Sequence, residues 1–441
     1  PTETEEIALL QRCVDAGCRD GVSGKVEATV DGMPLETSMQ ALWNIRKLAL
    51  FDRYGEYNLS CHCGKVKATF LCDRKSITAW DCNCTDCAMR GNIHIITKYD
   101  VIDTCAACQL CTIACPVDNS MGQLVRKLRT PYISTTEQKV LDFQAKHFGA
   151  VNQVISTGFD VLGVIHKITG DGITNALMKT GRLISKEVPY WNPDFPKGGK
   201  LPKPSPAKAG QETVVYFPAC GGRTFGPTPK DPDNRTLPEV VVTLLERAGY
   251  NVITPEKTRD LCCGQMWESK GDFKNADAKR QELIDVLSKM SNGGKIPVLV
   301  DALSCTYRTL TGNPQVQITD LVEFMHDKLL DKLTINKKVN VALHLGCSAR
   351  KMKLEPKMQA IANACSAQVL KPAGIECCGY AGEKGLYKPE INASALRNIK
   401  KLIPVEVKEG YYANRMCEVG LTQHSGISYR HLAYLLEECS R

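Results

Sequence analysis

The sequence is poor in aromatic residues and lacks long apolar runs. Aromatic residues are 6% of the chain, while hydrophobic residues reach 43% and charged residues 24%, a balance typical of folded globular proteins. No stretch approaches the roughly 18 apolar residues that cross a bilayer, so we predict no transmembrane segment and leave a peripheral membrane contact open. The acidic first residues are unlike a signal or transit peptide.

A strongly basic region is also missing. The 56 Lys and Arg exceed the 48 Asp and Glu by a net charge of +8 that is spread along the chain, so nucleic acid is not an expected partner. There is no GxGxxG after a strand, no Walker loop and no recognisable Ser or Cys triad. Hydride or carbanion chemistry normally needs a flavin or nicotinamide, so the chain is expected to be part of an enzyme.

What is abundant is cysteine, with 22 residues in a chain of 441. Many lie in runs with spacings of one to three residues, such as Cys262-Cys263, and neighbouring cysteines rarely bridge each other. A loop that presents several thiolates to one centre suits a metal ion or an iron–sulfur cluster better than a disulfide framework. Such centres need a reducing compartment.

Composition and periodicity divide the chain into six segments. We expect a helical N-terminal stretch (1–58), a small Cys-rich β segment (59–100), a ferredoxin-like iron–sulfur motif with helical sequence (101–191), a linker rich in Pro, Gly and Lys (192–211) and two α/β domains (212–330 and 331–441). Strands are predicted at 213–217, 298–300 and 339–345, and a helix from Pro238 to Gly249. This alternation predicts mostly parallel sheets, so the fold class is α+β and α/β.

The two α/β domains repeat one pattern of cysteines. In each domain one cysteine precedes an adjacent Cys-Cys-Gly and another follows it: Cys220, Cys262, Cys263 and Cys305 in the first, and Cys347, Cys377, Cys378 and Cys417 in the second. Four thiolates suit one cubane 4Fe–4S cluster per domain, with zinc and buried free thiols as the alternatives. The glycine after each pair is expected to let the backbone approach the cluster.

The region before the linker contains the bacterial ferredoxin spacing C-x2-C-x2-C-x3-C-P, formed by Cys105, Cys108, Cys111 and Cys115. The first three thiolates would hold one 4Fe–4S cluster, and the fourth usually ligates another. No second motif of this kind completes the set. Either Cys115 shares a second centre with an upstream thiol, or one cluster borrows a ligand from elsewhere in the chain.

A further group of thiols has a spacing that favours tetrahedral zinc: Cys61, Cys63, Cys82, Cys84 and Cys87. The set is incomplete, so a structural relic is nearly as strong an alternative as a working zinc site. Elsewhere, Cys365 is expected to be a packed core thiol and His344 a core histidine whose hydrogen bonds are satisfied. The apolar helical stripe at 151–167 is more typical of a core than of a membrane anchor.

Together these motifs resemble those of a known family. The stretches IDTCAACQLCTIACPVD, VVYFPAC, CCGQMWESKG, VDALSCTYRTL, ECCGYAGEKG and YYANRMCEVGL are similar to the C-terminal iron–sulfur (CCG-domain) region of FAD-linked D-lactate dehydrogenases, to the glycolate oxidase iron–sulfur subunit and to the CCG-containing subunit of heterodisulfide reductase. The family's flavin-binding domain and first ferredoxin motif are not found in this sequence. Ala302 and Asn414 stand where the heterodisulfide reductase repeats have the earlier cysteine of a CxxC.

A second resemblance covers only about forty residues. The segment from Cys61 to Cys87 is similar to the glutathione-dependent formaldehyde-activating family, a zinc β-fold in which CxC is structural and CxCxxC catalytic. The later CxxC pair of that family is missing unless Cys105 and Cys108 serve, and the ferredoxin motif uses those two. We therefore expect no lyase activity.

The first resemblance implies an iron–sulfur electron-transfer subunit or fragment of a flavin-dependent D-2-hydroxy acid dehydrogenase, of D-lactate or glycolate type. FAD would lie on a partner flavoprotein, and 4Fe–4S clusters here would pass electrons to quinone or another respiratory-chain acceptor, such as a membrane complex. The alternatives are a heterodisulfide-reductase-like thiol–disulfide enzyme and a non-catalytic structural subunit of a respiratory assembly. The missing initiator Met would fit a cleaved precursor, which favours the mitochondrial matrix side over the cytoplasm or a peripheral inner-membrane location.

Overall fold

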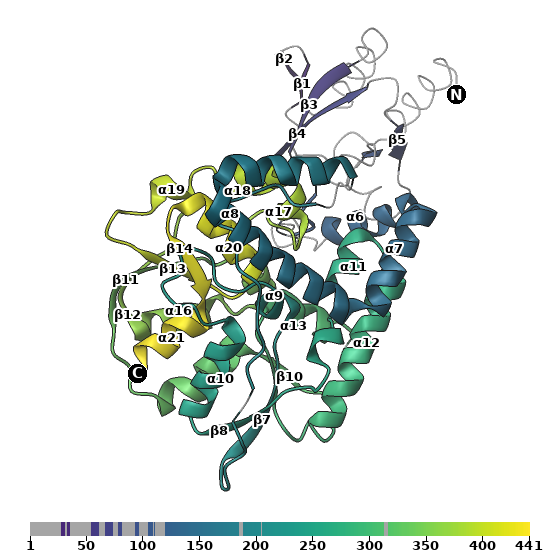
Figure 1. The fold of residues 1–441 in the computed structure, drawn as a ribbon. Helices are drawn as coiled ribbons and strands as arrows, with labels where there is room; N and C mark the ends of the chain where they lie inside the picture. Colours follow the sequence, from purple (N-terminus) through teal and green to yellow (C-terminus); the bar gives the residue numbers. More distant parts are fainter. Residues whose placement is uncertain are drawn as a thin grey trace, which may run out of the picture. The chain divides into compact units, whose positions relative to one another are not determined.

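The computed structural model describes residues 105–108, 110, 120–184, 188–203, 205–312 and 316–441, and the backbone of six short strands before them. The chain forms two compact units. The first contains residues 1–105 and 109–125, and the second contains residues 106–108 and 126–441. Figure 1 shows the elements of each unit.

The described residues of the first unit include three antiparallel strand pairs. β1 (Ala28–Val30) pairs with β2 (Met33–Leu35), β3 (Tyr54–Ser60) with β4 (Lys67–Asp73), and β5 (Thr78–Asp81) with β6 (Ile93–Ile96). The expected helical stretch over 1–58 is therefore wrong for its described residues, because the backbone there forms strand ladders. The cysteines of the predicted zinc group lie outside the described residues.

In the part of the chain that the structure describes, three helices precede the α/β domains: α6 (Met121–Arg129), α7 (Thr135–Lys146) and α8 (Phe148–Ile184), with a 3-10 turn, η1 (Thr130–Tyr132), after α6. The hydroxyl of Ser134 accepts a hydrogen bond from the Glu137 amide at 3.2 Å and so caps α7. Gly170, with φ 73° and ψ −178°, interrupts α8 and divides it into two helical parts.

Helix α8 is the one helix of the described residues that is long and apolar enough to cross a membrane, judged by length and composition alone. The stretch that qualifies is Phe148–Leu183, and 28% of its most apolar window is buried. Its apolar residues do not form one uninterrupted run, because polar residues such as Asn152 and Asp160 separate them.

The predicted linker packs against its neighbours. The amide of Gly199 donates to the carbonyl of Thr224 at 2.8 Å, and the buried ring of Phe195 packs edge-on to Phe159 of α8 with 5.3 Å between centroids. A side chain at Gly199 would place its Cβ 2.3 Å from the carbonyl oxygen of Arg223. Glycine therefore permits a close backbone approach that composition alone did not indicate.

The first α/β domain contains a four-stranded parallel sheet in the order β8-β7-β9-β10. Its strands are β7 (Glu212–Phe217), β8 (Tyr250–Ile253), β9 (Val298–Val300) and β10 (Ile318–Asp320). Helices cover the sheet: α9 (Cys220–Thr224), α10 (Leu237–Arg247), α11 (Gln265–Lys270), α12 (Phe273–Met290), α13 (Leu303–Leu310) and α14 (Leu321–Phe324), with the short turns η2 (Thr258–Asp260), η3 (Met325–Leu329) and η4 (Leu330–Lys332). Central strands are buried on both faces, which explains their continuous apolar sequence.

The second α/β domain has the same topology, with strand order β12-β11-β13-β14. Its strands are β11 (Lys338–Leu343), β12 (Ser366–Leu370), β13 (Glu409–Tyr412) and β14 (Ser428–His431). Its helices are α15 (Cys347–Met352), α16 (Glu355–Cys365), α17 (Lys384–Tyr387), α18 (Pro389–Leu396), α19 (Ile399–Leu402), α20 (Arg415–Ser425) and α21 (Leu432–Cys439). The prediction of two α/β domains with parallel sheets is thus confirmed.

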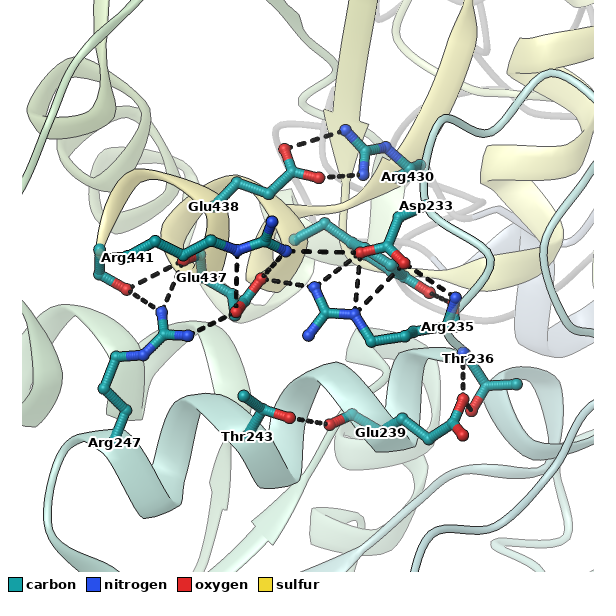
Figure 2. Close-up of polar contacts among 12 residues, drawn as sticks. Asp233, Arg235, Thr236, Glu239, Thr243, Arg247, Arg430, Glu437, Glu438 and Arg441 are labelled. Atoms are coloured by element: carbon teal, nitrogen blue, oxygen red, sulfur yellow. Dashed lines mark hydrogen bonds and ion pairs between the residues drawn. The ribbon is translucent and has the colours of Figure 1, made fainter.

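Helices α10 and α21 pack against each other and join the two α/β domains through one hydrophobic core. A charged cluster borders this contact (Figure 2). The carboxylate of Glu437 in α21, 1% exposed, pairs with Arg235 at 2.7 Å and with Arg247 of α10 at 2.6 Å. Arg441 adds a third guanidinium at 2.8 Å, and together these hydrogen bonds lower the pKa of Glu437 to about 2.

Replacing Glu437 by Gln should destabilise the protein at neutral pH. The pKa of Glu437 is about 2 in the folded protein, against its usual 4.5. The ionised carboxylate therefore adds on the order of 3 kcal/mol to the free energy of unfolding above pH 4.5, and this stabilisation is lost as the pH falls through 2. The difference in unfolding midpoint between wild type and Glu437→Gln should therefore be largest at pH 7, be clearly smaller at pH 3 and vanish only below pH 2. The same change at exposed Glu406 is the control; an equal difference at both pH values would contradict the prediction.

Candidate functional site

The cysteines of both α/β domains lie beyond the carboxyl ends of the parallel strands. Cys220 begins α9 just after β7, and Cys305 lies in α13 just after β9. In the second domain Cys347 begins α15 after β11, and Cys417 lies in α20 after β13. The strands of each pair are neighbours from which the chain turns to opposite sides, and such a switch point is where open α/β sheets bind ligands.

The first domain brings its four thiols into one hydrogen-bonded ring, which we name the first thiol set: Cys220, Cys262, Cys263 and Cys305. Cys220 and Cys263 each interact with both Cys262 and Cys305. Cys220 and Cys263 accept hydrogen bonds from these two neighbours, which lowers the pKa of both. Cys262 and Cys305 donate these hydrogen bonds, which raises their own pKa. The ring is therefore suited to carry negative charge on sulfur.

The second domain arranges its thiols, the second thiol set, in a chain: Cys417, Cys378, Cys377 and Cys347. Hydrogen bonds from Cys377 and Cys417 lower the pKa of Cys378, and a hydrogen bond from Cys377 lowers that of Cys347. Cys378 is buried at 3% exposure. Each domain thus gathers the four cysteines that the repeated pattern had singled out.

Backbone amides point at the adjacent cysteine pairs. Gly264 N–H donates to the Cys262 sulfur at 3.4 Å, and Gly379 N–H donates to the Cys377 sulfur at 3.3 Å. The next amide along donates to the second sulfur of each pair, from Gln265 to Cys263 and from Tyr380 to Cys378. These donors stabilise thiolates and would also face the sulfurs of a bound cluster.

The glycines of the two Cys-Cys-Gly turns have left-handed backbones, with φ of 82° at Gly264 and 69° at Gly379. A Cβ on Gly264 would lie 2.0 Å from the carbonyl oxygen of Ala276, and one on Gly379 would lie 2.6 Å from that of Ile391. The sequence suggested an approach of backbone to a cluster; the structure shows an approach of each turn to the second helix after it, α12 or α18.

Cys108 of the ferredoxin-like motif reaches the second thiol set. Its thiol shares a hydrogen bond with Cys377 and lies within electrostatic range of Cys347. Cys111 and Cys115 lie outside the described residues. The sequence left open whether a cluster borrows a ligand from elsewhere in the chain. The spacing of cysteines within the ferredoxin-like motif could not indicate that Cys108 pairs with the distant Cys377.

Both thiol sets line one cavity of about 710 Å³. Helix α8 also lines this cavity, through apolar side chains that include Val151, Ile155, Phe159 and Leu162. Since α8 precedes both domains in the chain, no local motif predicted that it would close their common site. The cavity can shield bound groups from water on this side.

Charged groups differ between the two ends of the cavity. Beside the first set, Asp301 is 1% exposed and accepts hydrogen bonds from the Tyr216 hydroxyl at 2.6 Å and the Ala219 amide at 2.7 Å. Burial raises the pKa of Asp301 to about 6, so it is mostly ionised at neutral pH. Beside the second set, Lys351 lines the cavity near Cys347, and burial lowers its pKa.

The other described cysteines are Cys105, Cys365 and Cys439, and every described cysteine is free of disulfides. Cys365 packs in the core at 0% exposure, as expected, and the Cys439 thiol donates to its carbonyl at 3.3 Å. The prediction that His344 is a core histidine with satisfied hydrogen bonds is only half right. The residue is 2% exposed, but its Nε2 atom has no hydrogen-bond partner. Among the described residues no group of three or more His, Cys, Asp or Glu side chains is close enough to hold a single metal ion, which needs its ligands closer together than the cysteines of a 4Fe–4S cluster are.

Comparison with known families identifies the repeated domain. The model of the CCG cysteine-rich domain matches residues 214–308 and again residues 341–421. The chain carries two CCG domains. Each match contains all four cysteines of one thiol set, and a domain of this kind indicates a Cys-rich redox module of iron–sulfur type.

Two further comparisons add little. No curated protein matches this chain. An aspartate racemase homologue from Pyrococcus horikoshii OT3 aligns with 52% of this chain and 96% of its own, at 8% identity and a TM-score of 0.22. A score this low supports no statement about fold or function.

The residues of each CCG domain are compatible with iron–sulfur binding. Each thiol set offers four sulfur donors, which is the number that a 4Fe–4S cluster takes, and backbone N–H groups that can bond sulfur. Cys220, Cys262, Cys263 and Cys305 would hold a cluster in the first domain. Cys347, Cys377, Cys378 and Cys417 would hold one in the second.

Replacing Gly264 by Ala should damage the first thiol set. Gly249 offers a matched control, since its φ is 85° but a Cβ there would meet no atom within 4 Å. Gly249→Ala should cost only the backbone strain of about 1 kcal/mol, whereas Gly264→Ala adds the overlap with Ala276. Unfolding midpoints and bound iron should fall clearly further for Gly264→Ala. Equal losses in the two variants would contradict this prediction.

Proposed function

We propose that this chain is the iron–sulfur electron-transfer subunit, or a fragment, of a flavin-dependent D-2-hydroxy acid dehydrogenase of D-lactate or glycolate type. The observation that carries the proposal is the pair of buried four-thiol sets that line one cavity in duplicated CCG domains. A 4Fe–4S cluster supplies one-electron redox chemistry when bound to such thiolates. The family resemblance supplies the dehydrogenase class.

The chain's own residues have three tasks in this proposal. The thiols bind, the backbone amides of the Cys-Cys-Gly turns stabilise negative charge on sulfur, and α8 with the two domains excludes water. Because both sets line the same cavity, they would lie on one route for electrons within the protein. Cys108 extends the path from the second set to the ferredoxin-like motif.

Partners and location belong to the same proposal. FAD would reside on a partner flavoprotein, because no nucleotide-binding motif was found in this sequence. The apolar cavity wall and the exposed apolar residues of α8, such as Val154 and Ile168, favour an apolar acceptor such as quinone, or an acceptor in a membrane complex. The need for reduced thiols fits the mitochondrial matrix side and also the cytoplasm. Zinc at the Cys61 to Cys87 group stays a prediction.

Replacement of Cys263 by Ser should remove the cluster of the first set. Anaerobically purified Cys263→Ser should contain about four iron and four sulfide atoms fewer per chain than wild type and should lose one low-temperature EPR signal on reduction. Cys365→Ser is the matched control, because Cys365 is equally buried but belongs to neither set. Zinc without iron in the wild type, or equal iron in both variants, would contradict the proposal.

A second candidate function is thiol–disulfide chemistry. It is favoured by the opening of both thiol sets onto one cavity, where a disulfide substrate could meet two redox centres. This candidate expects the isolated chain to reduce a heterodisulfide with an artificial electron donor and no flavoprotein. A purely structural subunit, in contrast, would co-purify with a respiratory complex whose turnover is unchanged by Cys263→Ser.

A further inference from the structure

Two buried polar side chains beside the second thiol set have atoms without hydrogen-bond partners. His344 follows the last residue of β11, and Tyr412 is the last residue of the neighbouring strand β13. The Nε2 atom of His344 and the hydroxyl of Tyr412 both lack a partner, although the residues are 2% and 0% exposed. Buried polar groups are nearly always satisfied, so this pair calls for a ligand, a cluster or a water molecule.

The two unpartnered atoms converge on one place. A Cβ on Gly346 would lie 2.7 Å from His344 Nε2 and 2.7 Å from the Tyr412 hydroxyl. Gly346 directly precedes Cys347, and its missing side chain leaves both polar atoms room beside this cysteine. Tyr412 is within electrostatic range of all four thiols of the second set, and His344 of Cys378.

Both side chains have protons to donate. Burial raises the pKa of Tyr412 well above its usual value, so its hydroxyl stays protonated at neutral pH. Burial lowers the pKa of His344 to about 4, so the ring is neutral and one nitrogen carries a proton. The rings contact each other edge-on at 4.8 Å between centroids, which fixes their relative orientation.

The first domain has no such pair at the matching positions. Counted from the first cysteine of each set, His344 corresponds to Phe217, and counted from the last, Tyr412 corresponds to Val300. Two charged residues also have no charged counterpart in the other domain. Lys351 of the second domain corresponds to Thr224, and Asp301 of the first domain corresponds to Ala413. The second set therefore has two added hydrogen-bond donors, and it has Lys351 together with the buried carboxyl of Glu418, while the first set has the buried carboxylate of Asp301.

We propose that His344 and Tyr412 donate hydrogen bonds, directly or through one water molecule, to sulfur at the second thiol set and make a cluster there easier to reduce than one in the first set. This inference rests on the proposed function, since it requires a cluster in each set. Hydrogen bonds to sulfur and nearby positive charge stabilise the reduced, more negative cluster and so raise its reduction potential. Electrons would then run from the first set to the second, with one electron moved and no bond broken.

The test is an EPR-monitored redox titration of the full chain, with signals assigned by their loss in Cys263→Ser for the first set and in Cys378→Ser for the second. In wild type the signal of the second set should have the higher midpoint potential. His344→Phe, which installs the residue type of the first domain, and Tyr412→Phe should each weaken reduction of the second cluster about tenfold, a shift of about −59 mV for a one-electron couple. The first cluster should not shift.

Two controls separate hydrogen bonding from packing. Tyr429→Phe removes another buried, unpartnered hydroxyl of the same domain, one that lies outside the influence of the thiols, and should leave both potentials unchanged. His344→Gln keeps an N–H donor near Nε2 and should largely restore the wild-type potential. Iron content confirms that each variant is loaded.

The outcomes distinguish this inference from the proposed function. Iron-free wild-type protein without EPR signals would end the proposed function. Two assigned clusters whose potentials stay unchanged in His344→Phe and Tyr412→Phe would overturn the inference alone. So would a higher potential at the first set, or a shift in Tyr429→Phe as large as that in Tyr412→Phe.

Discussion

Sulfur atoms from separate parts of the chain must converge on one point in each domain, and the parallel sheet makes this possible. Neighbouring strands deliver the first and last cysteines at their carboxyl ends, while the Cys-Cys-Gly turn supplies the middle pair between them. The turn is held in place because Gly264 and Gly379 let it touch the backbone of a later helix, α12 or α18. Thiol geometry thus depends on strand order, turn conformation and helix packing together.

Duplication produced two sites of the same plan with different surroundings. The topology, the cysteine positions and the amide donors repeat, whereas the side chains behind the thiols do not. Phe217 and Asp301 accompany the first set, and His344 and Lys351 accompany the second. In a module that carries electrons, unequal surroundings are a physical means of giving the transfer a direction, because potential follows hydrogen bonding and charge.

Elements outside the two CCG domains complete the cavity that the thiol sets share. Helix α8 forms its apolar wall, and Cys108 joins the second set from the ferredoxin-like motif. The segment after α8 is held against the first domain by close backbone contacts at Gly199. Removal of the region before the CCG domains would therefore expose the cavity as well as delete the ferredoxin-like motif.

The sequence alone determined the CCG domains, the grouping of their cysteines and the parallel sheets, because local periodicity and Cys-Cys-Gly spacing directly reflect strand ends and turns. It missed the strands in residues 1–58, the packing of the linker and the membrane-compatible length of α8. Only the tertiary structure decided that Cys108 meets Cys377, that α8 closes the cavity and that His344 lacks a partner. These are contacts between residues far apart in the chain, and no local pattern encodes which distant groups will face each other.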